Sequence, residues 1–404
     1  MHYFDSRRIE MLSLAYMKSD GRVSAAAAVG LLLALYSAKS RSLSPAAVAK
    51  LAALGDMPQW RSDFRHAYME LARTRDTDRI TAKFQEEVIP QMMKLRPEIT
   101  KRFQSELPVD PVELEQNPQW QEILDKSGIA DRLKEMSEIQ EEGGDVMMGT
   151  FSQLKSFPFF NDVANWFMPF HADRSEFVGG PQGAGMFADL LADMPVLCDS
   201  DKYSMMLTML MAPAQQRDMM VRQLNTQQEA ISQLRAASLN TAESDRKGVF
   251  NKVVQNLFRF FRLYRRKGEF PNPFEGAINL CGIKWLGAEL ADAGLLSLIA
   301  EFYFTHRYYQ DALDTYGQLL GIEQPTAYVY QKMGYACQKT GRLEQAVGYL
   351  EKSEMLDPGS AWALRLLARC YLQLGQYAKA VDALERLETM SPDVTDNALL
   401  LGHA

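Results

Sequence analysis

A 34-residue period near the C-terminal end of the chain constrains the fold more than any other sequence feature. Three consecutive segments between Ala293 and Pro392 repeat the same residue types at the same offsets. The repeated positions are Ala300, Gly334 and Ala368; Ala312, Ala346 and Ala380; Tyr316, Leu350 and Leu384; and Pro358 with Pro392. Small side chains let two helices approach closely, large apolar ones fill between them, and proline ends a helix. The period therefore predicts three stacked helical hairpins.

These hairpins resemble the tetratricopeptide repeat (TPR), a pair of antiparallel helices with small residues where the helices meet. Upstream, residues 250–286 keep the Tyr264, Gly268 and Phe270 pattern but carry an insertion at PNPF, and they look like a degenerate first repeat. After Pro392, the core positions of a further first helix fall on Ala398, Leu401 and Gly402. We therefore expect a TPR array over residues 246–404, with three clear repeats at 293–392, a degenerate one before and a truncated one after. The truncation favours a fragment of a longer parent, and a short capping helix is the alternative.

The N-terminal half is expected to be helical in a different way. Residues 1–140 are predicted to form a HEAT-like or irregular helical domain, because Asp20–Leu35 resembles the second helix of a HEAT repeat. Amphipathic patterns predict two further helices within 72–103 and two within 117–143, and residues 201–245 are predicted to be connecting helices. Few segments alternate with a period of two, so the expected fold class is an all-α helical-repeat solenoid. The whole chain also looks like large uncharacterised TPR proteins of Bacteroidota type, a resemblance that implies no activity.

An aromatic and glycine-rich junction is predicted over residues 141–200. The stretch FPFFNDVANWFMPF begins at Phe157, and its Phe159, Val163, Trp166 and Phe170 fall on one face if the segment is helical. One interpretation is a buried wedge between the two halves of the chain. The other is an exposed secondary aromatic site made by Phe159, Trp166 and Phe170.

Composition limits the classes of function. The formal net charge is -7, which argues against a general affinity for nucleic acid or an anionic membrane. The longest apolar run is 12 residues, below the roughly 20 that cross a bilayer, so no membrane span is expected. The acidic start lacks the pattern of a secretory signal, and four widely spaced cysteines predict reduced thiols and a cytoplasmic protein.

No catalytic machinery is predicted. The five histidines lack a second ligand at metal spacing, so we expect no catalytic residues, no metal site and no cofactor. Two alternative functions stay open at this point. The chain could be a substrate-recruiting fragment of a larger enzyme, or it could bind RNA through the basic and aromatic helix at 257–267.

The predicted function is that of a non-catalytic protein-protein interaction scaffold. In the TPR family the first helix of each repeat lines a concave groove, and the resemblance places groove positions on Tyr328, Gln331, Lys332, Tyr335, Gln338, Lys339, Trp362, Arg365, Arg369 and Gln373. This basic and aromatic set favours an extended acidic or aromatic-bearing peptide, and ordinary solvated helix faces are the alternative. The carboxylate clamp of chaperone-binding members is not expected, because its positions hold Ser297, Glu301, Lys332, Trp362 and Leu366.

Overall fold

The computed structural model describes residues 5–38, 41–88, 90, 139, 144–145, 148–194, 197–222, 224 and 241–390. These residues contain helices and turns but no strand, which confirms the predicted all-α class. The chain divides into two compact units, Met1–Ile278 (unit 1) and Asn279–Ala404 (unit 2). The helices expected within 91–103 and 117–138 and the truncated repeat after Pro392 lie outside the described residues.

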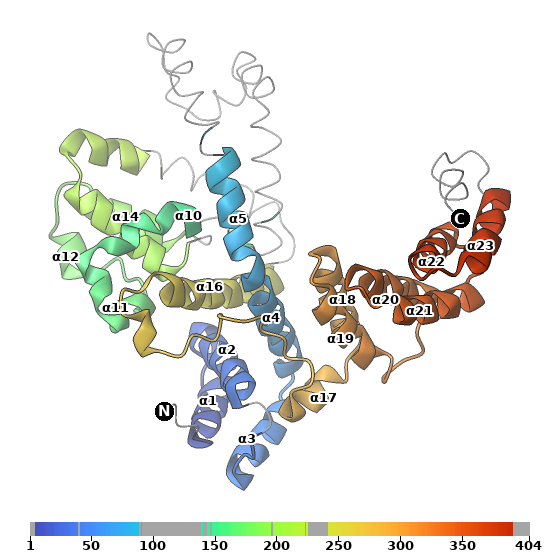
Figure 1. Ribbon diagram of the computed structural model, residues 1–404. Helices are drawn as coiled ribbons and strands as arrows, with labels where there is room; N and C mark the ends of the chain where they lie inside the picture. Colours follow the sequence, from blue (N-terminus) through green and yellow to red (C-terminus); the bar gives the residue numbers. More distant parts are fainter. Residues whose placement is uncertain are drawn as a thin grey trace. The chain divides into compact units, whose positions relative to one another are not determined.

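Unit 1 is built from helices of unequal length. Its longest helix, α16 (Thr241–Leu263), contacts α2 and α4 from the first part of the unit and α11 and α14 from the second (Figure 1). The other helices and helical turns are α1 (Arg7–Lys18), α2 (Gly21–Ala38), α3 (Pro45–Gly55), α4 (Trp60–Arg73), η1 (Thr74–Asp76), α5 (Thr77–Lys83), η2 (Phe84–Val88), α10 (Met148–Phe151), η3 (Gln153–Ser156), η4 (Pro158–Asn161), α11 (Val163–Phe167), α12 (Ser175–Val178), α13 (Ala184–Ala192), α14 (Asp199–Met211) and η5 (Lys267–Glu269).

Helix α2 is the apolar centre of the first part of unit 1. It packs against α1, α4 and α16, and the side chains of Leu31, Leu32 and Leu35 are fully buried. With 18 residues it is also long and apolar enough to cross a membrane by length and composition, although the 12-residue run predicted no span. More than half of the helix is buried against its neighbours, which is the packing of a core helix.

The aromatic segment is not the single helix that its spacing predicts. A 3-10 turn, η4, begins at Pro158, and α11 starts only after Asp162. Asp162 has an extended backbone, and its side chain accepts a hydrogen bond from the backbone nitrogen of Ala164 at 2.9 Å. This N-cap starts a new helix and rotates the residues that follow it, so the expected common face does not form.

The aromatic segment packs inside unit 1. Trp166 is only 1% exposed, its indole nitrogen donates to the Phe160 carbonyl at 2.9 Å, and its ring lies 5.7 Å from the ring of Phe260 on α16. The expected wedge between the two halves is therefore a contact within one unit. The prediction placed residues from 246 onward in the repeat array, whereas α16 belongs to unit 1.

The described residues of unit 2 form three helical hairpins after a short entry segment, η6 (Lys284–Leu286) and α17 (Gly287–Leu290). The hairpins are α18 (Ala293–Thr305) with α19 (Tyr309–Leu319), α20 (Ala327–Lys339) with α21 (Leu343–Leu356), and α22 (Ala361–Gln373) with α23 (Tyr377–Met390). The segment expected to be a degenerate repeat is instead α16 followed by turns. The proline-rich insertion and the short length of α17 leave no full second helix there.

Two more positions repeat with the 34-residue period in unit 2. The N-caps of the first helices are Asp292, Thr326 and Ser360, and each side chain accepts a backbone hydrogen bond. The turns inside the hairpins place Arg307, Gly341 and Gly375 in the left-handed region, with φ of 66°, 77° and 70°. Glycine adopts this conformation without steric cost, so the first repeat carries strain that the other two avoid.

Close helix contact explains the small residues of the period. A Cβ atom added at Gly334 on α20 would lie 2.5 Å from Leu350 Cγ and 3.3 Å from the Ala346 carbonyl oxygen on α21. Ala300, Ala312, Ala346 and Ala368 are all fully buried. Small side chains therefore set the distance between paired helices, as the sequence predicts.

Candidate partner-binding face

The predicted groove residues lie on two first helices of unit 2. Helix α20 carries Tyr328, Gln331, Lys332, Tyr335, Gln338 and Lys339, and α22 carries Trp362, Arg365, Arg369 and Gln373. Tyr328 is 55% exposed and Trp362 is 40% exposed, although both are large rings that usually gain from burial. Solvent-exposed rings on adjacent helices are typical of surfaces that bind a partner.

Aromatic contacts join all three first helices. The Tyr335 ring on α20 lies 5.6 Å from the Phe304 ring on α18 and 5.8 Å from the Trp362 ring on α22. Tyr309, at the start of α19, is 5.8 Å from Tyr335. Burial, with a smaller contribution from Tyr335, raises the pKa of the Tyr309 hydroxyl above its ordinary value. We refer to Phe304, Tyr309, Tyr335 and Trp362 as the ring ladder.

A salt bridge lies beside the ring ladder. Lys332 forms an ion pair with Glu301 on α18, and its ammonium group lies 4.7 Å from the Phe304 ring centre and 4.3 Å from that of Tyr328. Tyr316 donates a hydrogen bond to Glu301 at 2.5 Å; its pKa is raised by burial first and by Glu301 second. The positive charge of Lys332 is thus balanced within the face, which is less basic here than the sequence indicates.

The comparison with protein families agrees with this architecture. Residues 338–400 match the family model described as tetratricopeptide repeat. The matched residues begin at the end of α20 and include α21, α22 and α23, so this part of unit 2 is similar to the tetratricopeptide repeat. A comparison with curated proteins found no match.

A comparison with solved structures matched several proteins to this chain. The crystal structure of MamA has 23% identity and a TM-score of 0.28, and the match covers 34% of this chain and 78% of MamA. The TPR2AB domain of yeast Sti1 in a pHSP90 complex has 14% identity and a TM-score of 0.25, covering 63% and 94%. The APC/C hetero-tetramer Cut9-Hcn1 has 13% identity and a TM-score of 0.26, covering 98% and 67%. The assignment rests on the family match and the helix pairs, because these TM-scores are low.

Three of the residues that the sequence places at the clamp positions, Glu301, Lys332 and Leu366, are engaged in contacts within unit 2. Leu366 is only 4% exposed and packs in the core, so its side chain does not face a ligand. Glu301 and Lys332 are paired with each other. The charge of Lys332 is therefore compensated within this face.

The possible secondary aromatic site in unit 1 is largely a core. Trp166 is buried, whereas Phe159 and Phe170 are half-buried and pack on Tyr203 of α14, at 5.0 and 5.1 Å between ring centres. The Tyr203 hydroxyl donates to the Pro169 carbonyl at 2.8 Å. These contacts place the three predicted residues in the packing of unit 1.

The basic helix that raised the RNA alternative turns its central arginine inward. The amphipathic pattern predicts Arg259 on a polar face, but the side chain is 1% exposed, while Arg262 pairs with Asp78 and Arg266 with Glu269. Carboxylates of the protein itself engage Arg259, Arg262 and Arg266, and backbone carbonyls accept hydrogen bonds from Arg265 and Lys267. This arrangement favours a structural role for the helix.

A buried ion cluster, made by Asp145, Lys155, Asp201 and Arg259, joins four segments of unit 1. Arg259 donates to Asp145 at 2.9 and 2.5 Å and forms an ion pair with Asp201, whose other oxygen lies 2.8 Å from Lys155 Nζ. Burial lowers the pKa of Lys155 well below its ordinary value. Burial also acts to lower the pKa of Arg259, but Asp145 and Cys198 outweigh it and raise that pKa.

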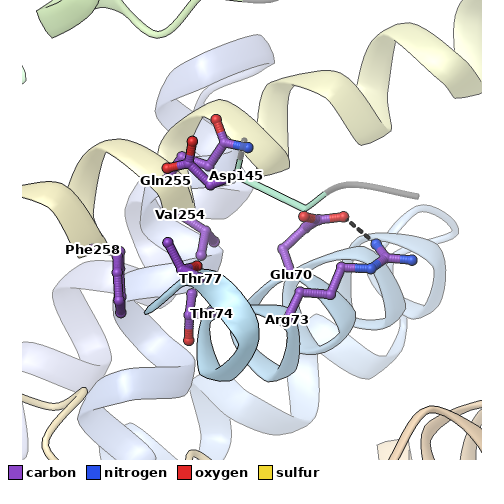
Figure 2. A pocket seen from close by; sticks show the side chains of 8 residues that line it. All are labelled: Glu70, Arg73, Thr74, Thr77, Asp145, Val254, Gln255 and Phe258. Carbon is purple, nitrogen blue, oxygen red and sulfur yellow. Dashed lines mark hydrogen bonds and ion pairs between the residues drawn. The ribbon is translucent and has the colours of Figure 1, made fainter. Parts of the chain in front are cut away.

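The residues of the ion cluster are far apart in the sequence and match no motif, so sequence reasoning missed them. Beside the cluster, a cavity of about 10 Å³ is lined by Asp145, Gln255, Thr77 and the hydrogen-bonded pair Glu70 and Arg73 (Figure 2). Such a volume holds about one water molecule, which is too small for a substrate. Among the described residues, no group of three or more His, Cys, Asp and Glu side chains could hold a metal ion.

Proposed function

We propose that this protein is a non-catalytic scaffold that binds a protein or peptide partner on the first helices of its TPRs. The observation that carries the proposal is the ring ladder, a continuous row of aromatic contacts across α18, α20 and α22. Half-exposed aromatic rings supply most of the free energy at many interfaces, because they bury large apolar areas with few rotatable bonds.

The proposed partner is an extended segment that carries aromatic or apolar side chains and some acidic ones. Aromatic side chains would pack on Tyr335 and Trp362. Lys339, whose ammonium group lies 5.1 Å from the Tyr335 ring, adds a positive charge at the edge of the ladder, and Arg365 and Arg369 add two more along α22. Since Glu301 balances Lys332, apolar contact contributes more to affinity than charge does.

A peptide array followed by affinity measurements on the best binder tests this function. Trp362→Ala should weaken binding by at least about tenfold, the usual loss for an aromatic hot spot. The matched control is Tyr377→Ala, which removes a 56% exposed ring from α23, a second helix, and should leave the affinity unchanged.

The charge contribution is tested separately with the double variant Arg365→Glu and Arg369→Glu at two salt concentrations. We expect weaker binding of acidic peptides and a smaller dependence on salt, because screening acts on exposed charges. Thermal melting shows whether each variant is folded. If Trp362→Ala and the double variant both bind the same peptides with the wild-type affinity, the ring ladder is not the binding site.

A further inference from the structure

A cleft of about 540 Å³ opens in unit 1, far larger than the one-water cavity described above. This volume lies in the range of small-molecule sites, roughly 300 to 1,000 Å³. Its walls come from α2, α16 and the segment 271–276, and its rim includes Asp5 and Arg8 from the start of the chain. All of these residues belong to unit 1, so the cleft is independent of the TPR face.

Small residues on α2 create the floor of the cleft. Gly30 and Ala34 are one helical turn apart and both line it, within a helix otherwise rich in leucine. A Cβ atom at Gly30 would lie 3.2 Å from Leu12 Cδ2 on α1, so Ala34 is the small side chain that faces the cleft. Across from them, Leu257, Phe261 and Pro273 provide apolar walls. A ligand with an apolar body would be buried against these side chains.

The wall made by segment 271–276 is held in place. The Tyr36 hydroxyl donates to the Ala277 carbonyl at 2.9 Å, and the Phe274 ring packs 5.2 Å from Phe258 and 5.8 Å from Phe261. The Asn272 side-chain oxygen accepts a hydrogen bond from the Phe274 backbone nitrogen at 2.9 Å. The side-chain NH₂ group of Asn272 is not used in this bond and can donate to another acceptor. The cleft is therefore pre-formed, which lowers the entropy lost on binding.

The rim carries one negative and one positive side chain, Asp5 and Arg8. The Asp5 carboxylate accepts a hydrogen bond from the Arg7 backbone nitrogen at 2.9 Å and lies 3.9 Å from the Arg7 guanidinium. Within the part of the chain that the structure describes, the Arg8 guanidinium has neither a hydrogen bond nor an ion pair. A guanidinium at the edge of an apolar cleft is suited to bind a carboxylate in two parallel hydrogen bonds.

We propose that this cleft binds a small amphipathic carboxylate, with its hydrocarbon body against Ala34 and Phe261 and its carboxylate on Arg8. The probe is decanoate, below the concentration at which it forms micelles, titrated calorimetrically into the full chain. Decanol has the same tail without the charge. We expect one decanoate per chain and at least tenfold weaker binding of decanol.

Two kinds of variant locate the site. Arg8→Gln should reduce decanoate binding to the level of decanol and leave decanol unchanged, and Lys18→Gln, at the other end of α1, is the charge-matched control. Ala34→Phe should abolish binding of both probes by filling the floor. If that variant does not fold, Ser37→Trp at the exposed rim should obstruct the cleft without entering the core.

Each other outcome overturns the proposal. Absence of saturable binding removes the site, and binding that survives both cleft-filling variants places the probe elsewhere. Equal affinities for decanol and decanoate remove the role of Arg8. Trp362→Ala should bind decanoate normally, because the cleft belongs to unit 1, and loss of binding in that variant would also overturn the proposal.

Discussion

The two units differ in where they place their charges. Within the described residues, every buried charged side chain belongs to unit 1, namely Asp63, Glu70, Asp76, Asp145, Lys155, Asp201, Lys202 and Arg259. Among the described residues of unit 2, the buried polar side chains other than tyrosine and cysteine are the uncharged Thr315 and Ser353. Buried charges need partners at specific positions, whereas a repeated apolar contact needs only the same residue types again. Unit 1 thus depends on unique long-range pairs, and unit 2 on a local pattern that recurs.

The largest expected effect comes from breaking the ion cluster. Arg259→Leu leaves Asp145 buried without its cation and removes one of the two cations that Asp201 contacts, so unit 1 should lose about 3 to 5 kcal/mol of unfolding free energy. Arg262→Leu on the same helix is the control. Its partner is Asp78, the two side chains are 37% and 59% exposed, and the loss should stay below about 1 kcal/mol. Differential scanning calorimetry measures the melting temperature of both variants. Equal melting temperatures would contradict the predicted difference between the buried ion cluster and the exposed Arg262–Asp78 pair.

A smaller effect is expected where the paired helices of unit 2 meet. Gly334→Ala introduces a methyl group 2.5 Å from Leu350 Cγ, which should cost about 1 to 3 kcal/mol despite the better helix propensity of alanine. Gly348→Ala on α21 meets no atom within 4 Å and should stabilise the unit by roughly 0.5 to 1 kcal/mol. Chemical denaturation of the two variants should give shifts of opposite sign. Shifts of the same sign would show that close contact with Leu350 is not the reason why position 334 requires glycine.

The smallest effect concerns the turn of the first repeat. Arg307 has a φ of 66°, and the equivalent positions of the other repeats hold Gly341 and Gly375. Arg307→Gly should relieve strain and raise the unfolding free energy by about 1 kcal/mol. The reciprocal change Gly375→Ala should lower it by a similar amount. A fall in melting temperature for Arg307→Gly would mean that contacts of the arginine side chain outweigh the strain.

The sequence predicted only part of the candidate partner-binding face on the first helices of unit 2. Tyr335 and Trp362 could be placed on first helices because the period gives their positions. Phe304 was not assigned to a shared face with them. The ion pair of Glu301 with Lys332, two residues at the clamp positions, removes part of the charge that the residue types implied. Residue type gives a side chain its charge, but its partners give the net charge of a surface.

The sequence by itself determined the repeats. The helix pairs, their N-caps and the left-handed turns at Arg307, Gly341 and Gly375 depend on residues within one 34-residue segment, so the pattern of pairs can be read along the chain. Only the tertiary structure decided that Arg259 is buried, that a new helix begins after Asp162, and that α2, α16 and residues 271–276 enclose a cleft. Each of these outcomes depends on the three-dimensional packing around the residue, and Asp145 lies 114 positions from Arg259. Burial and long-range pairing are set by which segments fold against each other, and no local period records them.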